Sequence, residues 1–84
     1  MKYNLEYAEK TLKKLQTKEV TGNNRKSLKS RLNIILTELY NNNIDIEFLA
    51  IKYDIIKSID IYINKINNKK FIIVRYENCY NFSK

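Results

Sequence analysis

Amide and cationic side chains recur between Lys57 and Asn68, together with a regularly spaced set of isoleucines. The isoleucines at positions 59, 63 and 66 are four and three residues apart, which predicts the buried face of a helix over residues 57–67. Asparagine can hydrogen-bond adenine, lysine can bind guanine or phosphate, and isoleucine can contact the methyl group of thymine. The exposed part of this helix therefore holds candidate base-reading groups: Lys57, Ser58, Ile61, Asn64, Lys65 and Asn68.

Side chains that commonly perform catalysis are scarce in this chain. It has no histidine, one cysteine and one glycine. The lack of histidine removes the commonest general base and metal ligand, and a single cysteine provides neither an internal disulfide nor a zinc cluster. One glycine is too few for a phosphate-binding glycine loop. We therefore expect no enzymatic activity, no metal and no cofactor, and we interpret Cys79 as a small packing residue.

Positive charge is concentrated in the first third of the chain. Residues 1–31 hold nine Lys and Arg against three Glu, whereas residues 32–84 hold seven basic and six acidic residues. Asn, Ile, Lys and Tyr make up 45 of the 84 residues and all have AT-rich codons, so genomic base composition is an alternative source of the lysines. If DNA is the partner, the candidate contacts with its backbone are Arg25, Lys26, Lys29, Arg31, Lys69, Lys70 and Arg75.

Two longer helices are predicted before this segment. Leu5, Ala8, Leu12 and Leu15 are spaced by three, four and three residues, which indicates a helix from Asn4 to about Val20 that Gly22 would end. Leu5, Leu12 and Leu15 are expected either to pack on the rest of the chain or to form the seam of a dimer. A second stripe, over residues 24–40, consists of Leu28, Leu32, Ile35, Leu36 and Leu39.

The remaining elements are short. Asp45 is a plausible cap for a helix that ends near Tyr53 and carries the run Phe48-Leu49-Ala50. The β-branched and aromatic run over residues 71–76 predicts a strand, Glu77 and Asn78 can turn the chain, and residues 79–82 can return as a second strand.

Residues 25–82 resemble a winged helix-turn-helix domain in the order of these elements. The matching features are a first helix at 25–40, the Phe-Leu-Ala run at 48–50, the isoleucine-faced third helix, and the strand at 71–74, where the family places the first strand of its wing. The resemblance implies a mainly α fold with a small C-terminal β-hairpin. An extra N-terminal helix, residues 1–22, would precede the domain at 23–84 and form one structural unit with it. The third helix would then enter the major groove of DNA, and the wing would contact the backbone or the minor groove.

Two classes of function stay open on this reading. The first is a small sequence-specific DNA-binding regulator, from a mobile element such as a phage or plasmid or from an AT-rich bacterial or viral genome. It would bind double-stranded DNA, with a homodimer as one arrangement. The second is an inhibitor or adaptor that binds a protein partner through Ile61 and exposed tyrosines. No apolar run approaches the roughly 18–20 residues that cross a bilayer, so we expect no membrane partner and a location in the cytoplasm or nucleoid.

Overall fold

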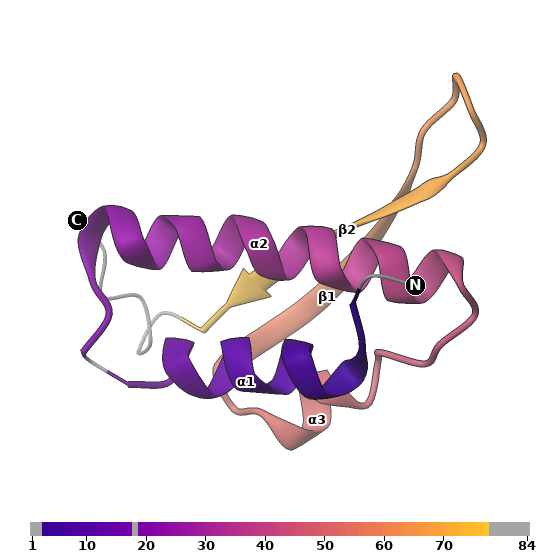
Figure 1. Ribbon diagram of the computed structural model, residues 1–84. Coiled ribbons are helices and arrows are strands. Elements are labelled where there is room, and N and C mark those ends of the chain that lie inside the picture. Colours follow the sequence, from indigo (N-terminus) through magenta and orange to yellow (C-terminus); the bar gives the residue numbers. More distant parts are fainter. Residues whose placement is uncertain (1–2, 18, 78–84) are drawn as a thin grey trace.

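Three helices precede an antiparallel β-hairpin in the part of the chain that the structure describes. The computed structural model describes residues 3–17 and 19–77. The elements are α1 (Leu5–Leu15), α2 (Gly22–Asn41), α3 (Leu49–Lys52), β1 (Ile56–Ile63) and β2 (Lys70–Tyr76). Both α1 and the hairpin pack against the long central helix α2 (Figure 1). The predicted class, mainly α with a C-terminal β-hairpin and an additional N-terminal helix, is confirmed.

Helix α1 buries the leucine stripe that its spacing predicted. The side chain of Asn4 caps the helix by accepting a hydrogen bond from the Tyr7 amide at 2.8 Å. Leu12 and Leu15 are fully buried, and Leu5 is partly buried against the same core. Leu12 and Leu15 thus pack within a single chain, which is the first of the two arrangements expected for this stripe. The helix ends at Leu15, earlier than expected.

Helix α2 supplies most of the core and matches its predicted range closely. Leu32, Ile35, Leu36 and Leu39 are all fully buried. They meet α1 on one side and the inward-facing residues Ile72 and Val74 of β2 on another, in one continuous apolar cluster. The left-handed backbone that the sequence assigned to Gly22 is present, with a φ of 61°, but it starts α2 instead of ending α1.

The third helix predicted over residues 57–67 is wrong, because these residues form strand β1 and the turn that follows it. In the register of the hairpin, Ile59 lies opposite Val74 and Ile61 lies opposite Ile72. The β-branched isoleucines at 59, 61 and 63 alternate with polar or aromatic residues, which suits a strand with one buried face. Ile66, which the helical spacing placed in the core, is 96% exposed.

The hairpin is therefore built from a different pair of segments than the sequence indicated. Strand β2 coincides with the predicted strand at 71–76, but its partner is β1. The predicted partner, residues 79–82, and the packing role assigned to Cys79 lie outside the described residues. The short helix expected near residues 45–53 is present as α3, but it covers only Leu49–Lys52. The prediction that Asp45 caps it is wrong, because the helix begins after Phe48 and the Asp45 carboxylate accepts from the Glu47 amide at 3.1 Å, ahead of the helix.

Side chains of α2 cover the outer edge of β2. Every fourth residue of the helix hydrogen-bonds every second residue of the strand. The pairs are Asn33 with Val74, Thr37 with Ile72 and Asn41 with Lys70, at 2.9, 2.9 and 3.2 Å between the side-chain oxygen and the strand nitrogen. Four residues of helix advance about 6 Å and two residues of strand about 6.6 Å, so the two periods stay matched over three pairs.

Replacing Thr37 with valine should destabilise the fold by about 1–2 kcal/mol, because the Ile72 amide would lose its acceptor while partly buried. The two side chains have nearly the same shape, so little packing changes. Urea unfolding followed by circular dichroism measures the difference. Thr17→Val is the matched control, because the Thr17 hydroxyl is exposed and bonds only the nearby Lys14 carbonyl. An equal change in both variants would contradict a specific role for the Thr37 bond.

Candidate nucleic-acid interface

The turn between the strands projects away from the helices (Figure 1). We refer to residues 64–70 as the hairpin tip. Its backbone is closed by hydrogen bonds from the Asn64 amide to the Lys69 carbonyl and from the Asn68 amide to the Asn64 carbonyl, both 2.8 Å. Asn68 has a φ of 59°, a left-handed conformation that asparagine tolerates better than most residues.

Asparagine side chains also hold the hairpin tip in shape. The Asn64 side-chain oxygen accepts from the Ile66 amide, and the Asn67 oxygen accepts from the Lys69 amide, each at 2.9 Å. Both asparagines are exposed. The turn therefore presents amide donors from a backbone that is already ordered, which lowers the entropy lost on binding.

Positive charge on the hairpin tip has no acidic neighbour along the hairpin. Lys65, Lys69 and Lys70 are exposed, and no Asp or Glu occurs from Ile61 to Tyr76. Asp60, the acid closest to the tip along β1, accepts a hydrogen bond from Nε of Arg75 at 2.5 Å. This hydrogen bond lowers the pKa of Asp60 below its usual value. Arg75 is thus paired on the strand, whereas none of the three tip lysines forms an ion pair among residues 3–17 and 19–77, although Asp45 lines the same hollow as Lys70.

An aromatic pair lies beside the hairpin tip on the face of the hairpin that points away from the core. The rings of Tyr62 and Phe71 are stacked, with centroids 5.3 Å apart and planes at 19°. The two residues are 39% and 40% exposed. Nη2 of Arg75 donates to the Tyr62 hydroxyl at 3.4 Å. This face therefore offers an apolar surface edged by polar groups.

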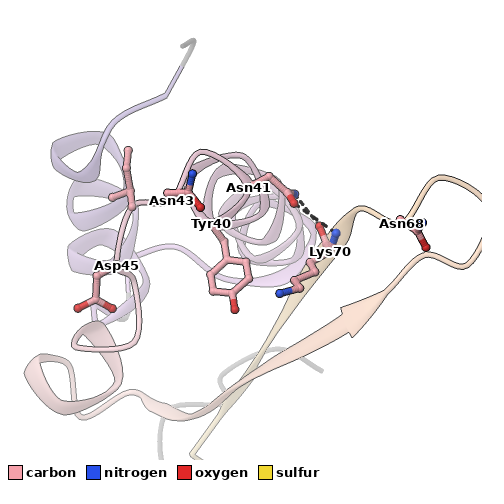
Figure 2. A pocket seen from close by; sticks show the side chains of 7 residues that line it. Tyr40, Asn41, Asn43, Asp45, Asn68 and Lys70 are labelled. Atoms are coloured by element: carbon pink, nitrogen blue, oxygen red, sulfur yellow. Dashed lines mark hydrogen bonds between the residues drawn. The ribbon is translucent and has the colours of Figure 1, made fainter.

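A shallow hollow of about 370 Å³ separates the hairpin tip from the C-terminal end of α2 (Figure 2). The Asn41 side chain bridges it, accepting from the Lys70 amide and donating to the Lys70 carbonyl at 2.6 Å. The Lys70 ammonium lies 5.4 Å from the ring centroid of Tyr40. These contacts brace the base of the hairpin against α2.

The structure divides the residues that the sequence placed on one helix. Asn64, Lys65 and Asn68 meet at the hairpin tip, beside Lys69 and Lys70. The others do not join them, because β1 is extended. Lys57 and Ser58 lie at its opposite end, where the Ser58 hydroxyl donates to Asp60 at 3.1 Å, and Ile61 is half-buried against the core.

Comparison with protein-family models, with curated proteins and with solved structures gives no match. Among the described residues, no helix is both long and apolar enough to cross a lipid bilayer.

Arg25, predicted to contact the DNA backbone, is instead fully buried. Its Nη1 donates to the carbonyls of Thr17 and Val20, at 3.4 and 3.3 Å, in the connection between α1 and α2. Burial lowers the pKa of the guanidinium, since the charged form is separated from water. The arginine thus donates to carbonyls of the loop between α1 and α2. The prediction that Arg25 contacts the DNA backbone is wrong, because its side chain is not exposed.

The other predicted cations of α2 differ in exposure. Lys26 and Arg31 are exposed, whereas Lys29 is half-buried with its ammonium 4.7 Å from the ring centroid of Tyr76. Burial lowers the pKa of Lys29. Only Lys26 and Arg31 of this group are therefore fully presented to a ligand.

A second basic surface lies in the groove between α1 and α2. A hollow of about 350 Å³ is lined by Leu28 and by four cations, and Nη1 of Arg31 donates to the Tyr7 hydroxyl at 3.4 Å. The lining cations are Lys10, Lys13, Lys14 and Arg31. The three lysines were not among the DNA-contacting residues predicted from the sequence. Lys13 and Lys14 follow Lys10 by three and four residues, which places them on one face of the helix. This spacing could have indicated the basic surface.

Proposed function

We propose that this chain is a small DNA-binding protein that contacts duplex DNA through the hairpin tip. The observation that carries the proposal is an ordered, projecting hairpin with three exposed lysines and no acidic residue over its outer part. The major groove of B-DNA is wide enough to admit a two-stranded β-ribbon. Lysines at the tip would bind phosphate or guanine, and the side chains of Asn64 and Asn68 would bind adenine edges.

The order of helices followed by a hairpin supports a relation to winged helix-turn-helix proteins, with this hairpin in the position of the wing. Because residues 57–63 are a strand, we assign DNA contact to the wing and not to a third helix. Ile66 stands 96% exposed among the cationic and amide groups of the tip. An apolar side chain in that position suits contact with a thymine methyl group or with an opened base step in the minor groove.

A role as a transcriptional regulator follows from this proposal if binding depends on sequence. The basic groove between α1 and α2 supports additional contacts, since its four cations have the chemistry to bind phosphates. Phosphate contacts raise affinity for every duplex, whereas the asparagines of the hairpin tip would favour A·T pairs.

Titration of fluorescently labelled AT-rich and GC-rich duplexes, followed by anisotropy, tests the proposal. The association constant should fall steeply between about 50 and 200 mM salt, because each lysine–phosphate contact releases counterions. AT-rich duplexes should bind more tightly at equal salt. Absence of binding to any duplex at about 50 mM salt would overturn the proposal.

A second candidate function is a protein-binding adaptor or inhibitor. It is favoured by Ile51 on α3 and Ile34 on α2, which are 85% and 59% exposed. If duplexes fail to bind and Ile51→Asp abolishes capture of a purified partner, this function replaces DNA binding.

A further inference from the structure

The two outer edges of the hairpin differ in how their backbone groups are satisfied. On β2, the amides of residues 70, 72 and 74 point outward and bond the side chains of α2. Their partners across the hairpin are Ile63, Ile61 and Ile59. In an antiparallel pair, residues opposite an outward-pointing position also point outward. The amides and carbonyls of these three isoleucines therefore form the outer edge of β1.

This edge is open. No backbone or side-chain hydrogen bond in the described residues reaches the main chain of Ile59, Ile61 or Ile63 from outside the hairpin. Proteins usually protect such an edge with proline, an exposed charge or a bulge. Here the irregularity lies at the start of β1, between Ile56 and Ser58, and Asp60 is paired with Arg75. The stretch from Ile59 to Ile63 has no such protection.

We propose that the open edge of β1 binds a second copy of the same strand, antiparallel, about a two-fold axis at Ile61. The two hairpins would then form one four-stranded sheet. In this register Ile61 faces its counterpart, and Ile59 of each copy faces Ile63 of the other. Every outward amide and carbonyl of the three isoleucines finds a partner, since each such pair exchanges two hydrogen bonds.

The spacing of the isoleucines supports a second copy of this chain as the partner that binds the open edge. Isoleucines at 59, 61 and 63 read the same in both directions about Ile61, so the edge is complementary to itself. Ile63 is 60% exposed and would be covered by the partner's Ile59. A shift of the axis to Asp60 would place two aspartates directly opposite each other, which disfavours that register.

The charge of the chain predicts an unusual salt dependence for this dimer. Each copy carries a net charge of +7, and Lys57 and Lys65 flank the paired stretch. Screening reduces their repulsion, so the dimer should tighten as salt rises. DNA binding should weaken under the same change. The dimer proposal does not depend on DNA binding, so an experiment can refute either one without affecting the other.

Sedimentation velocity of the full chain over a range of concentrations tests the dimer. Ile63→Lys should weaken the dimer on the order of 100-fold, because one substitution acts twice at a two-fold interface. Ile34→Lys is the matched control, since Ile34 is equally exposed, at 59%, but lies on α2. It should leave the dimer intact. A monomer at every concentration and salt, or equal loss in both variants, would overturn the proposal.

Cysteine cross-linking in a Cys79→Ser background tests the register without relying on Ile63. With the axis at Ile61, an Ile61→Cys pair would have Cα atoms about 5.5 Å apart, which a disulfide can span. Ile59→Cys alone would leave about 14 Å between its copies and should not cross-link. Combining Ile59→Cys with Ile63→Cys should restore cross-linking. Cross-linking of Ile59→Cys but not of Ile61→Cys would overturn the register.

Discussion

Replacing Lys65, Lys69 and Lys70 with glutamine should weaken binding to duplex DNA on the order of 100-fold at about 0.1 M salt. The expected mechanism is the loss of three phosphate contacts. The slope of the logarithm of the association constant against the logarithm of salt concentration should become shallower by about 2.7, since each contact contributes about 0.9. The fold should persist, because the bonds between Asn41 and residue 70 use main-chain atoms of the strand.

The matched control for this variant removes the same charge from the other basic surface. Lys10, Lys13 and Lys14 line the groove between α1 and α2, and their replacement by glutamine lowers the net charge equally. Anisotropy titrations of both triple variants against one duplex separate a local contact from a general attraction. A larger loss of affinity in the α1 variant would show that DNA binds in the groove and not at the hairpin tip. Unchanged binding by the tip variant would refute the role of the hairpin tip.

Replacing Leu36 with alanine should destabilise the protein by about 2–4 kcal/mol. Leu36 is fully buried in α2, the helix against which both α1 and β2 pack. Removing most of its side chain leaves a cavity that neighbours on several elements cannot fill without moving together. Total stabilities run at about 0.05–0.15 kcal/mol per residue, so this loss is a large fraction of the whole for a chain of 84 residues.

Urea unfolding measured by circular dichroism gives the free energy of unfolding for this comparison. Ile34→Ala serves as the control, because Ile34 lies on the same helix but is 59% exposed. It should change stability by no more than about 0.5 kcal/mol. A loss for Leu36→Ala that is as small as for Ile34→Ala would show that the α2 core is not packed as described.

The spacing of apolar residues was enough to predict those helices and strands for which only one type of secondary structure fits the local sequence. The stripe of leucines and isoleucines in α2 fits only a helical period, and the helix is found over Gly22–Asn41. The β-branched run at 71–76 fits only a strand. In both cases the secondary structure that buries one face is also the one that the residue types favour. Packing against neighbouring elements therefore did not change it.

The segment from Ile59 to Ile66 shows where the sequence was ambiguous. Isoleucines at 59, 63 and 66 fit a helix, while those at 59, 61 and 63 fit a strand. The choice depends on β2, which pairs with this segment, and on α2, whose side chains hold the far edge of β2. The strand pairs join residues 7 to 15 positions apart, and the Thr37–Ile72 bond joins residues 35 positions apart, so the pattern within the segment could not reveal them.

The amino-acid sequence by itself determined the helices α1 and α2, the strand β2, the excess of positive charge and the lack of common catalytic groups. Only the tertiary structure decided which charges are presented to a ligand. It buried Arg25 under the connection between α1 and α2, and it gathered Asn64, Lys65, Asn68, Lys69 and Lys70 at one projecting turn. The reason is that charge and hydropathy are properties of single residues. Exposure and proximity, in contrast, depend on which distant segments pack together.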